Sequence, residues 1–323
     1  MPLFDLPLER LRDYRCPDAC PADFDAFWDD TLADGARRDL APRFEPLDDR
    51  LYDLVRVHDA SFAGFGGQTI RGWLLEPRHA KDPRPCIVSY VGYGGGRGLP
   101  IDHLAPPAAG FAHFVMDTRG QGSVWSPGDT PDDAGAGPQT PGFLTRGIES
   151  RETYYYRRVF VDAVRAVEAA AAHPGVDAAR IMVSGASQGG GIAIAVAGLR
   201  PDAVRLLAAD TPFLCHFRRA ATITDEAPYR EIADYLRCHR QRADAVFETL
   251  SYFDAAHFAA RVRARSLFSV GLMDLVCPPS TVFAAYNAIA AEKAIRVYEY
   301  NRHEGGASFQ AVERLRFAAE HLR

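Results

Sequence analysis

The segment 185–189 (GASQG) constrains the fold of this chain more than any other. It follows a short apolar run, 180–184 (RIMVS), and precedes a longer run of small apolar residues, 190–199 (GGIAIAVAGL). A G-x-S-x-G motif between a strand and a helix is typical of a nucleophile elbow, whose sharp turn lifts the serine hydroxyl above the edge of a sheet. Such a turn leaves no room for side chains two residues before and after the serine, so glycine is needed at both places. We therefore predict that Ser187 is a nucleophile at a strand-to-helix turn.

Strand-like and helix-like segments alternate along the chain. This βαβα alternation, with several continuous apolar strands, predicts an α/β fold with a mostly parallel central sheet covered by helices on both faces. The predicted strands are 51–57, 70–75, 86–91, 111–116, 180–184, 204–209, 266–272 and 295–300, and the predicted helices of the main body are 152–173, 190–199, 278–291 and 308–322.

Three further segments stand outside this alternation. We assign the whole chain, 1–323, to a single domain that includes them. The N-terminal extension, 1–45, contains an amphipathic helix at 24–39 that is expected to cover an edge of the main body. The segment 213–260, after the sixth predicted strand, is a helical insertion in the position of a cap; its aromatic residues are expected mainly to pack against one another. The segment 120–147 is rich in Gly, Pro, Asp and Thr and is too long for an ordinary connection, which indicates a functional loop.

Composition excludes several classes of function. The net charge of −5 over 323 residues argues against a nucleic-acid surface. No run of about 18 apolar residues is present, and the chain starts without a basic segment followed by an apolar one, so we expect neither membrane insertion nor export but a cytoplasmic protein. Six scattered cysteines are expected to be reduced thiols, and Cys16 and Cys20 lack the partners that a zinc site needs.

A serine nucleophile needs a histidine base and an acid that orients this base. In folds with this elbow, both follow the serine along the chain. His303 follows the last predicted strand, with two glycines after it that would let its loop bend over the elbow. The other histidines after the elbow lie in the insertion or at the end of the last helix, namely His216, His239, His257 and His321.

Two aspartates compete for the role of the acid. Asp210 and Asp274 each follow an apolar strand directly, so both are expected at the carboxyl edge of the sheet, where open α/β folds collect ligands. The pattern favours Asp274, because a short loop separates it from the next predicted helix. Asp210 could instead end its strand and orient the insertion, and the residues alone leave both assignments open.

Stabilising an oxyanion requires two backbone N–H groups. One is expected from Gln188, directly after the nucleophile, and the other from the glycine-rich loop 91–96 (VGYGGG), which follows an early predicted strand. A glycine-rich loop can also bind phosphate, but this one has neither the G-x-x-x-x-G-K-[ST] pattern nor a following helix. We therefore expect no nucleotide, and no other cofactor.

Together these motifs resemble those of carbohydrate esterase family 7, the acetyl xylan esterases and cephalosporin C deacetylases of the α/β-hydrolase superfamily. The family carries an Arg-Gly-Gln element, a G-x-S-Q-G elbow and a His-Glu pair, which match 119–121, 185–189 and 303–304. Further similar stretches extend the resemblance over essentially the whole chain. The resemblance implies that Ser187, Asp274 and His303 form a catalytic triad and that the N–H groups of Tyr93 and Gln188 form the oxyanion hole.

The same resemblance implies a function. A member of this family would remove acetyl groups from acetylated xylo-oligosaccharides and cephalosporin C through an acetyl-enzyme, without a metal or organic cofactor. It would form a homohexamer whose active sites open toward the interior. The alternative enzyme is another α/β-hydrolase with the same triad, a short-chain carboxylesterase or a peptidase, and the alternative outside catalysis is a binding protein that retains the fold.

Overall fold

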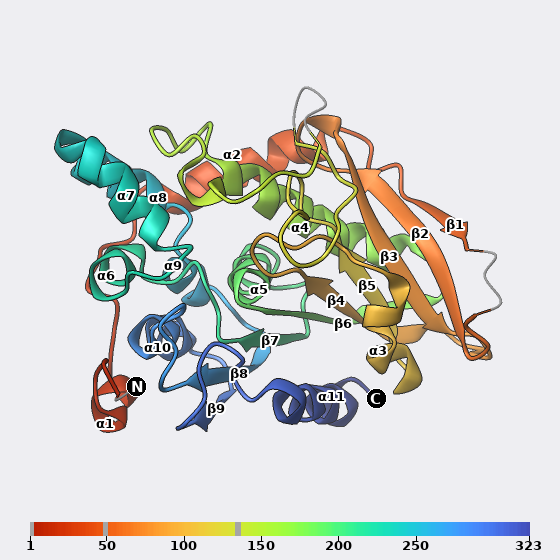
Figure 1. Cartoon of the computed structure of the whole chain (residues 1–323). Coiled ribbons are helices and arrows are strands. Elements are labelled where there is room, and N and C mark those ends of the chain that lie inside the picture. The colour runs from red at the N-terminus through yellow and green to blue at the C-terminus, as the bar shows by residue number, and fades with distance from the viewer. Residues whose placement is uncertain (1–2, 48–50, 133–136) are drawn as a thin grey trace.

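The computed structural model describes residues 3–47, 51–132 and 137–323. Within these residues, nine strands form one sheet in the order β1-β2-β3-β5-β4-β6-β7-β8-β9, which runs through the centre of the molecule (Figure 1). The strands are β1 (Arg43–Pro46), β2 (Val55–Ala63), β3 (Thr69–Pro77), β4 (Arg84–Tyr90), β5 (Ala112–Met116), β6 (Val176–Ala186), β7 (Leu206–Asp210), β8 (Arg265–Gly271) and β9 (Lys293–Tyr298).

From β5 to β9 all neighbouring strands are parallel, and only β1, β2 and β3 add antiparallel pairs at one edge. The prediction of a mostly parallel sheet is confirmed, and the architecture is that of an α/β-hydrolase. The sequence did not predict β1, which is mostly exposed at the edge and has no apolar run. The insertion therefore follows the seventh strand rather than the sixth.

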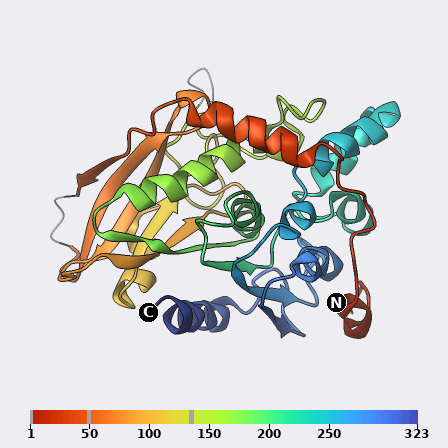
Figure 2. The same ribbon diagram turned by 180° about the vertical axis from the view of Figure 1, so that it is seen from behind.

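Helices cover both faces of the sheet. The first face packs against α4 (Tyr155–Ala172), α5 (Gln188–Leu199) and α10 (Pro279–Ala288), and the second against α3 (Ala105–Ala108) and α11 (Ala307–Leu322). The view from behind shows α4 in front of the sheet, with α2 (Phe24–Ala36) running beside one end of α4 (Figure 2). Alternate residues of each central strand face opposite layers, as the pleat requires: Ile181 and Val183 of β6 join one core cluster and Met182 joins another.

The N-terminal extension and the insertion pack against each other. The indole of Trp28 in α2 donates a 2.9 Å hydrogen bond to the carbonyl of Tyr252, and its ring lies edge-on to Phe253. The insertion consists of α6 (Phe217–Ile223), α7 (Arg230–Cys238), the short η4 (Arg240–Arg242), α8 (Ala243–Ser251) and α9 (Ala255–Ala259). Most of its aromatic side chains are buried in the main core, as expected.

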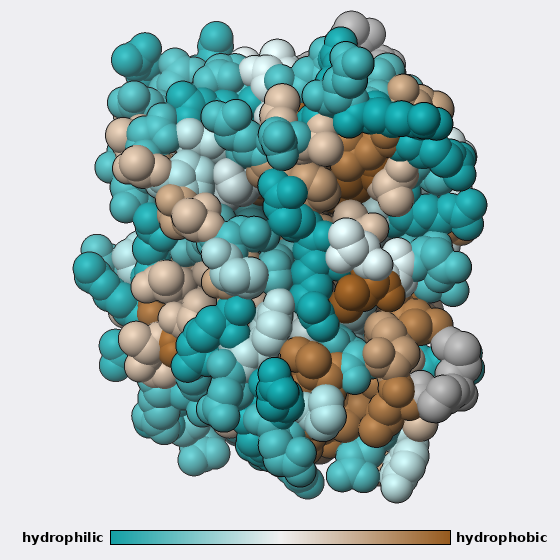
Figure 3. Space-filling view, turned by 90° about the vertical axis from the view of Figure 1, so that its left-hand side faces the viewer, coloured by the Kyte–Doolittle hydropathy of each residue, from teal (hydrophilic) through white to brown (hydrophobic). Residues whose placement is uncertain are grey.

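One face of the molecule shows how polar and apolar side chains are distributed on its surface. Seen from the side of α1 (Leu8–Arg12), α6 and α7, it is mainly hydrophilic, with apolar side chains gathered in separate patches (Figure 3). Among the described residues, no helix combines the length and apolar character that a membrane crossing needs. All six cysteines are free thiols.

Candidate functional site

Ser187 lies at the turn between β6 and α5 with the strained backbone of a nucleophile elbow, φ 56° and ψ −123°. Both flanking glycines are required by close approaches of the backbone. A Cβ at Gly185 would lie 2.3 Å from the carbonyl carbon of Gly189, and a Cβ at Gly189 would lie 2.0 Å from the carbonyl oxygen of Tyr90. The turn leaves Ser187 half-buried at the carboxyl edge of the sheet.

His303 and Asp274 meet at the same edge. The Nδ1 atom of His303 lies 2.9 Å from Oδ2 of Asp274, whose side chain is fully buried in the loop after β8. The other carboxylate oxygen accepts the backbone N–H groups of Val276 and Cys277, at 2.8 and 2.9 Å. The carboxylate is therefore fixed, and it accepts the Nδ1 proton of His303, which leaves Nε2 free to act as a base.

Asp210 has different partners. Its carboxylate accepts a 2.7 Å hydrogen bond from Gln310 and pairs with Arg314, both on α11. Burial raises the pKa of this carboxyl above its usual range. The expectation that Asp210 ends its strand is correct, since β7 stops there, but the expectation that it orients the insertion is wrong. Its side chain instead fastens the C-terminal helix to the sheet.

The backbone N–H groups of Tyr93 and Gln188 are available for an oxyanion. Within the described part of the chain, neither donates a hydrogen bond to another residue. The side chain of Gln188 is fully buried and donates to the carbonyl of Val91 at 3.1 Å, which holds the glycine-rich loop beside the elbow. Its carbonyl oxygen accepts hydrogen bonds from Gln121 and Tyr156, both at 2.8 Å.

The Arg-Gly-Gln element, 119–121, supports the glycine-rich loop 91–96. Gln121 accepts the N–H of Gly94 at 2.7 Å, so it braces the glycine-rich loop directly. Arg119 is buried and forms a bidentate pair with the buried Asp162, at 2.5 and 2.8 Å. A buried bidentate pair of this kind has a strict geometry. The element is thus a scaffold for the loop and does not reach the nucleophile through its own side chains.

The segment 120–147 continues this scaffold. The carboxylate of Asp117 accepts the N–H groups of Arg97, Asp129 and Thr130, at 2.6 to 2.8 Å, and so joins the middle of the segment to the end of the glycine-rich loop. The indole of Trp125 donates to the carbonyl of Tyr93 at 2.9 Å. Residues 133–136 of the predicted loop lie outside the described residues. The described part therefore forms a wall of the site.

Two residues at this site were not predicted. Glu231 of α7 accepts the hydroxyl of Tyr93 at 2.6 Å and the N–H of Leu144 at 3.0 Å, so the insertion is joined to the glycine-rich loop. Cys277 is buried beside the nucleophile, with its thiol hydrogen-bonded to Ser187, and burial raises the pKa of this thiol well above its usual range. No motif marks either residue, because their roles arise from contacts between distant segments.

A cavity of about 820 Å³ opens at Ser187 and His303. It extends along the sheet toward Ser89 and His113, and Trp125, 60% exposed, stands at its wall. The insertion contributes Ala227 and Pro228, whereas none of its aromatic side chains lines the cavity. This volume far exceeds that of an acetyl group, so the cavity has room for the alcohol part of an ester.

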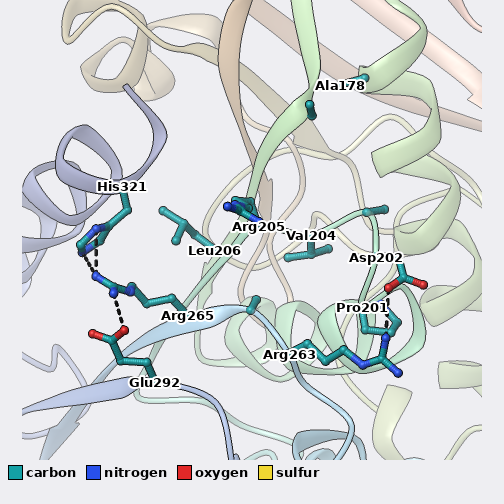
Figure 4. Close-up of a pocket in the computed structure, with 13 residues that line it drawn as sticks. Ala178, Pro201, Asp202, Val204, Arg205, Leu206, Arg263, Arg265, Glu292 and His321 are labelled. Carbon is teal, nitrogen blue, oxygen red and sulfur yellow. Dashed lines mark hydrogen bonds and ion pairs between the residues drawn. The ribbon is translucent and has the colours of Figure 1, made fainter.

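A second hollow, of about 730 Å³, lies at the opposite, amino-terminal end of the parallel strands (Figure 4). Most of its charged side chains are ion-paired. Arg265 pairs with Glu292 and contacts His321 at 3.0 Å, and Arg263 pairs with Asp202 at 3.1 Å. The paired charges and the distance from the carboxyl edge separate this hollow from the candidate site.

Three groups of potential metal ligands occur among the described residues, each with its ligand atoms within 4.8 Å of one another. The first group belongs to the candidate site, and its atoms already hold the hydrogen bonds given above. In the second, His216 contacts Tyr14 and Asp18 through its two ring nitrogens, both at 3.3 Å. The groups are, in this order, Asp274, Cys277 and His303; Cys16, Asp18 and His216; and His58, Glu76 and His173.

Comparisons with known proteins agree with this architecture. The acetyl xylan esterase (AXE1) family profile matches residues 1–321. An acetyl xylan esterase from Paenibacillus sp. R4 has 38% identity and a TM-score of 0.91, with 98% of this chain and 100% of that chain covered. Acetyl xylan esterase 1 from Thermoanaerobacterium sp. JW/SL YS485 has 34% identity and a TM-score of 0.90, with 99% and 100% covered.

More distant relatives have lower sequence identity, and a smaller part of their length is covered. The acetyl esterase Axe7A of Xylanibacter ruminicola is 26% identical over 295 residues, which are 88% of this chain but only 63% of that protein. An acylaminoacyl peptidase from Pyrococcus horikoshii has 16% identity and a TM-score of 0.55, with 88% of this chain and 41% of that chain covered. This last similarity is one of fold alone.

Proposed function

The chain belongs to the acetyl xylan esterase family, and from this premise we propose that it is a serine esterase that removes acetyl groups from acetylated xylo-oligosaccharides. In this proposal Ser187, His303 and Asp274 form the catalytic triad, and the N–H groups of Tyr93 and Gln188 bind the oxyanion. The single observation that best supports it is the 2.9 Å contact between His303 and the buried Asp274, at the cavity that also contains the elbow serine.

The mechanism follows from the roles of these groups. Ser187 Oγ attacks the acetyl carbonyl carbon while His303 accepts the hydroxyl proton, and Asp274 stabilises the resulting imidazolium. The two N–H groups stabilise the negative charge on the tetrahedral intermediate. The sugar alkoxide then leaves with the proton from His303. Water, deprotonated by His303, attacks the acetyl-enzyme, and acetate and the free serine are released.

The cavity supports a bulky, polar leaving group. With about 820 Å³ beside the nucleophile, it can hold a short oligosaccharide. Aromatic rings commonly pack against the apolar face of a sugar, and Trp125 offers an exposed ring held by its hydrogen bond to Tyr93. We propose cephalosporin C as a second substrate on the resemblance of the sequence alone.

Acetate release from acetylated xylobiose and from cephalosporin C tests the function directly. We expect the wild-type protein to release acetate from at least the first substrate and to be labelled by a serine-reactive phosphonate, and Ser187→Ala to do neither. Arg263→Gln, in the hollow at the opposite end of the strands, serves as a matched control that keeps both properties. Absence of labelling in the wild type would support a binding protein, and fast cleavage of peptides would support a peptidase.

We also propose the homohexamer that the resemblance implies, with the loop 120–147 as a candidate contact. Size exclusion with light scattering should then give about six times 35.5 kDa. Polymeric acetyl xylan should be a poorer substrate than its oligomers, because a polymer cannot enter a closed ring. A stable monomer, or equal rates on polymer and oligomer, would contradict the assembly and leave the triad unaffected. The cytoplasmic location expected from the sequence stays a prediction.

A further inference from the structure

A second group of chemically reactive side chains lies far from the candidate active site. His58 of β2, Glu76 of β3 and His173, directly after α4, are all buried, with 6%, 5% and 9% of their surfaces exposed. We name these three residues the His58–Glu76–His173 cluster. Polar side chains at such depth normally have hydrogen-bond partners, so the cluster needs a physical explanation.

His58 is the anomaly in this cluster. Both of its ring nitrogens are buried, and among the residues that the structure describes neither has a hydrogen-bond partner. Its Nε2 lies 3.5 Å from Oε1 of Glu76, and this distance is longer than a normal hydrogen bond. A buried imidazole whose only polar contact is a long one to a carboxylate is poorly satisfied, and an ion between the two groups would satisfy both.

The other two members complete a set of ligands. Oε2 of Glu76 lies 4.0 Å from Nδ1 of His173, and the imidazole rings of His58 and His173 have centroids 5.1 Å apart. Ligand atoms from all three residues lie within 4.8 Å of one another. In a tetrahedral zinc site with bonds of about 2.1 Å, neighbouring ligand atoms are roughly 3.4 Å apart, so a small inward movement of the side chains suffices.

The surroundings of the cluster fit a coordination site. Nη1 of Arg56 donates to Oε1 of Glu76 at 2.6 Å, a contact of the kind that orients a ligating carboxylate. Gly175 approaches so closely that a Cβ there would lie 2.2 Å from Oε2 of Glu76. Its N–H donates to Nδ1 of His173 at 3.1 Å, so this nitrogen carries a lone pair, and an ion bound there would replace that one hydrogen bond.

We propose that His58, Glu76 and His173 bind one divalent transition-metal ion, with zinc as the ion best matched by two imidazoles and a carboxylate. The ion would join β2 and β3 to the end of α4. Three strands, β3, β5 and β4, separate β2 from β6, which places the site about 19 Å across the sheet from Ser187. Its role is therefore structural, and it is independent of the proposed esterase activity.

The test uses the full-length protein, stripped with a chelator and then titrated with Zn²⁺ or Co²⁺. We expect one ion per chain and a rise in Tm of about 4 °C at a hundredfold excess over Kd. Glu76→Gln keeps an acceptor for Arg56 but removes the anionic ligand, and His58→Gln removes an imidazole. Each of these two variants should bind the metal ion about tenfold to a hundredfold more weakly. His79→Gln, at an exposed histidine close in sequence, should bind the ion as tightly as the wild type.

The Co²⁺ form distinguishes this cluster from the two clusters that contain cysteine. The proposed ligands include no sulfur, so bound Co²⁺ should show d–d absorption without a thiolate charge-transfer band. If His58→Gln does not fold, the metal affinity of Glu76→Gln, compared with that of the wild type, tests the proposal. Binding that is unchanged in the variants that fold, a thiolate band, or no bound ion in the wild type would each overturn the proposal, and the last result would leave only a buried ion-pair cluster.

Discussion

The imidazole of His303 lies 2.9 Å from the buried carboxylate of Asp274, which in turn is held by two backbone N–H groups. If Asp274 sets the tautomer of His303, Asp274→Asn should lower kcat by about 10⁴. The reason is that an amide cannot stabilise the imidazolium and can favour the wrong tautomer. Steady-state kinetics on an acetate ester, with Tm to verify folding, measures the effect.

Asp210→Asn is the matched control, because Asp210 also follows an apolar strand but contacts Gln310 and Arg314 on α11. We expect less than about a tenfold loss of kcat and a loss of roughly 1–3 kcal/mol in the free energy of unfolding, since a buried charged hydrogen bond is weakened. Equal losses of kcat in the two variants would contradict the assignment of the acid.

Glu231 offers a test of the link between the insertion and the glycine-rich loop. Its carboxylate accepts the Tyr93 hydroxyl and the N–H of Leu144. Glu231→Gln should lower kcat by about tenfold or more with little change in KM, because the Tyr93 N–H loses its fixed position relative to the oxyanion. Glu226→Gln, at an exposed carboxylate of the same insertion, should leave both constants unchanged. A selective rise in KM would instead assign Glu231 to substrate binding.

Local rules explain why parts of this site could be predicted. The elbow fixes Ser187 through the sterics of its two glycines, and the order of strands leaves His303 at the carboxyl edge. The strand β1 was not predicted, because it is short and mostly exposed. The segment β2 was predicted too early, at 51–57, because polar residues alternate with apolar ones beyond Val57 in an antiparallel strand at Val55–Ala63.

Contacts between distant segments could not be read in the same way. Glu231 is 138 positions from Tyr93, and nothing near either residue indicates that they meet. The aromatic residues of the insertion pack in the core, as expected, but the sequence did not show which residues would line the cavity in their place. Cys277 lies beside the nucleophile, and no motif marks this cysteine.

Cys277 leads to a prediction about acyl size. Its buried thiol lies next to Ser187, and we predict that it limits the space for acyl carbons beyond acetyl. Each methylene forced into a full pocket costs of the order of 1–3 kcal/mol, so acetate esters should exceed butyrate esters at least about tenfold in kcat/KM. Cys277→Ala should narrow this ratio. Comparable wild-type rates on acetate and octanoate esters would favour a lipase-like enzyme.

His113 gives a prediction about pH and stability. It is buried at the far end of the cavity, where its Nδ1 contacts the carbonyl of His103 at 3.1 Å and its Nε2 contacts the hydroxyl of Ser89 at 2.9 Å. Burial lowers the pKa of His113 from 6.5 to about 3. Between these two values the unfolded chain binds a proton at this histidine and the folded chain does not, so stability falls as the pH falls.

The contribution of neutral His113 to the free energy of unfolding is therefore fully present above pH 6.5, and it is lost progressively as the pH falls toward 3. Between pH 6.5 and pH 5 it should remove about 2 kcal/mol from the free energy of unfolding, measured by urea denaturation at each pH. His113→Gln keeps an acceptor for Ser89, and in this variant the part of the slope of unfolding free energy against pH that comes from His113 should disappear. The contributions of all other groups cancel when the variant is compared with the wild type. His79→Gln, at an exposed histidine, should keep the wild-type slope. An unchanged slope in His113→Gln would mean that burial does not lower the pKa of His113, and it would contradict the prediction.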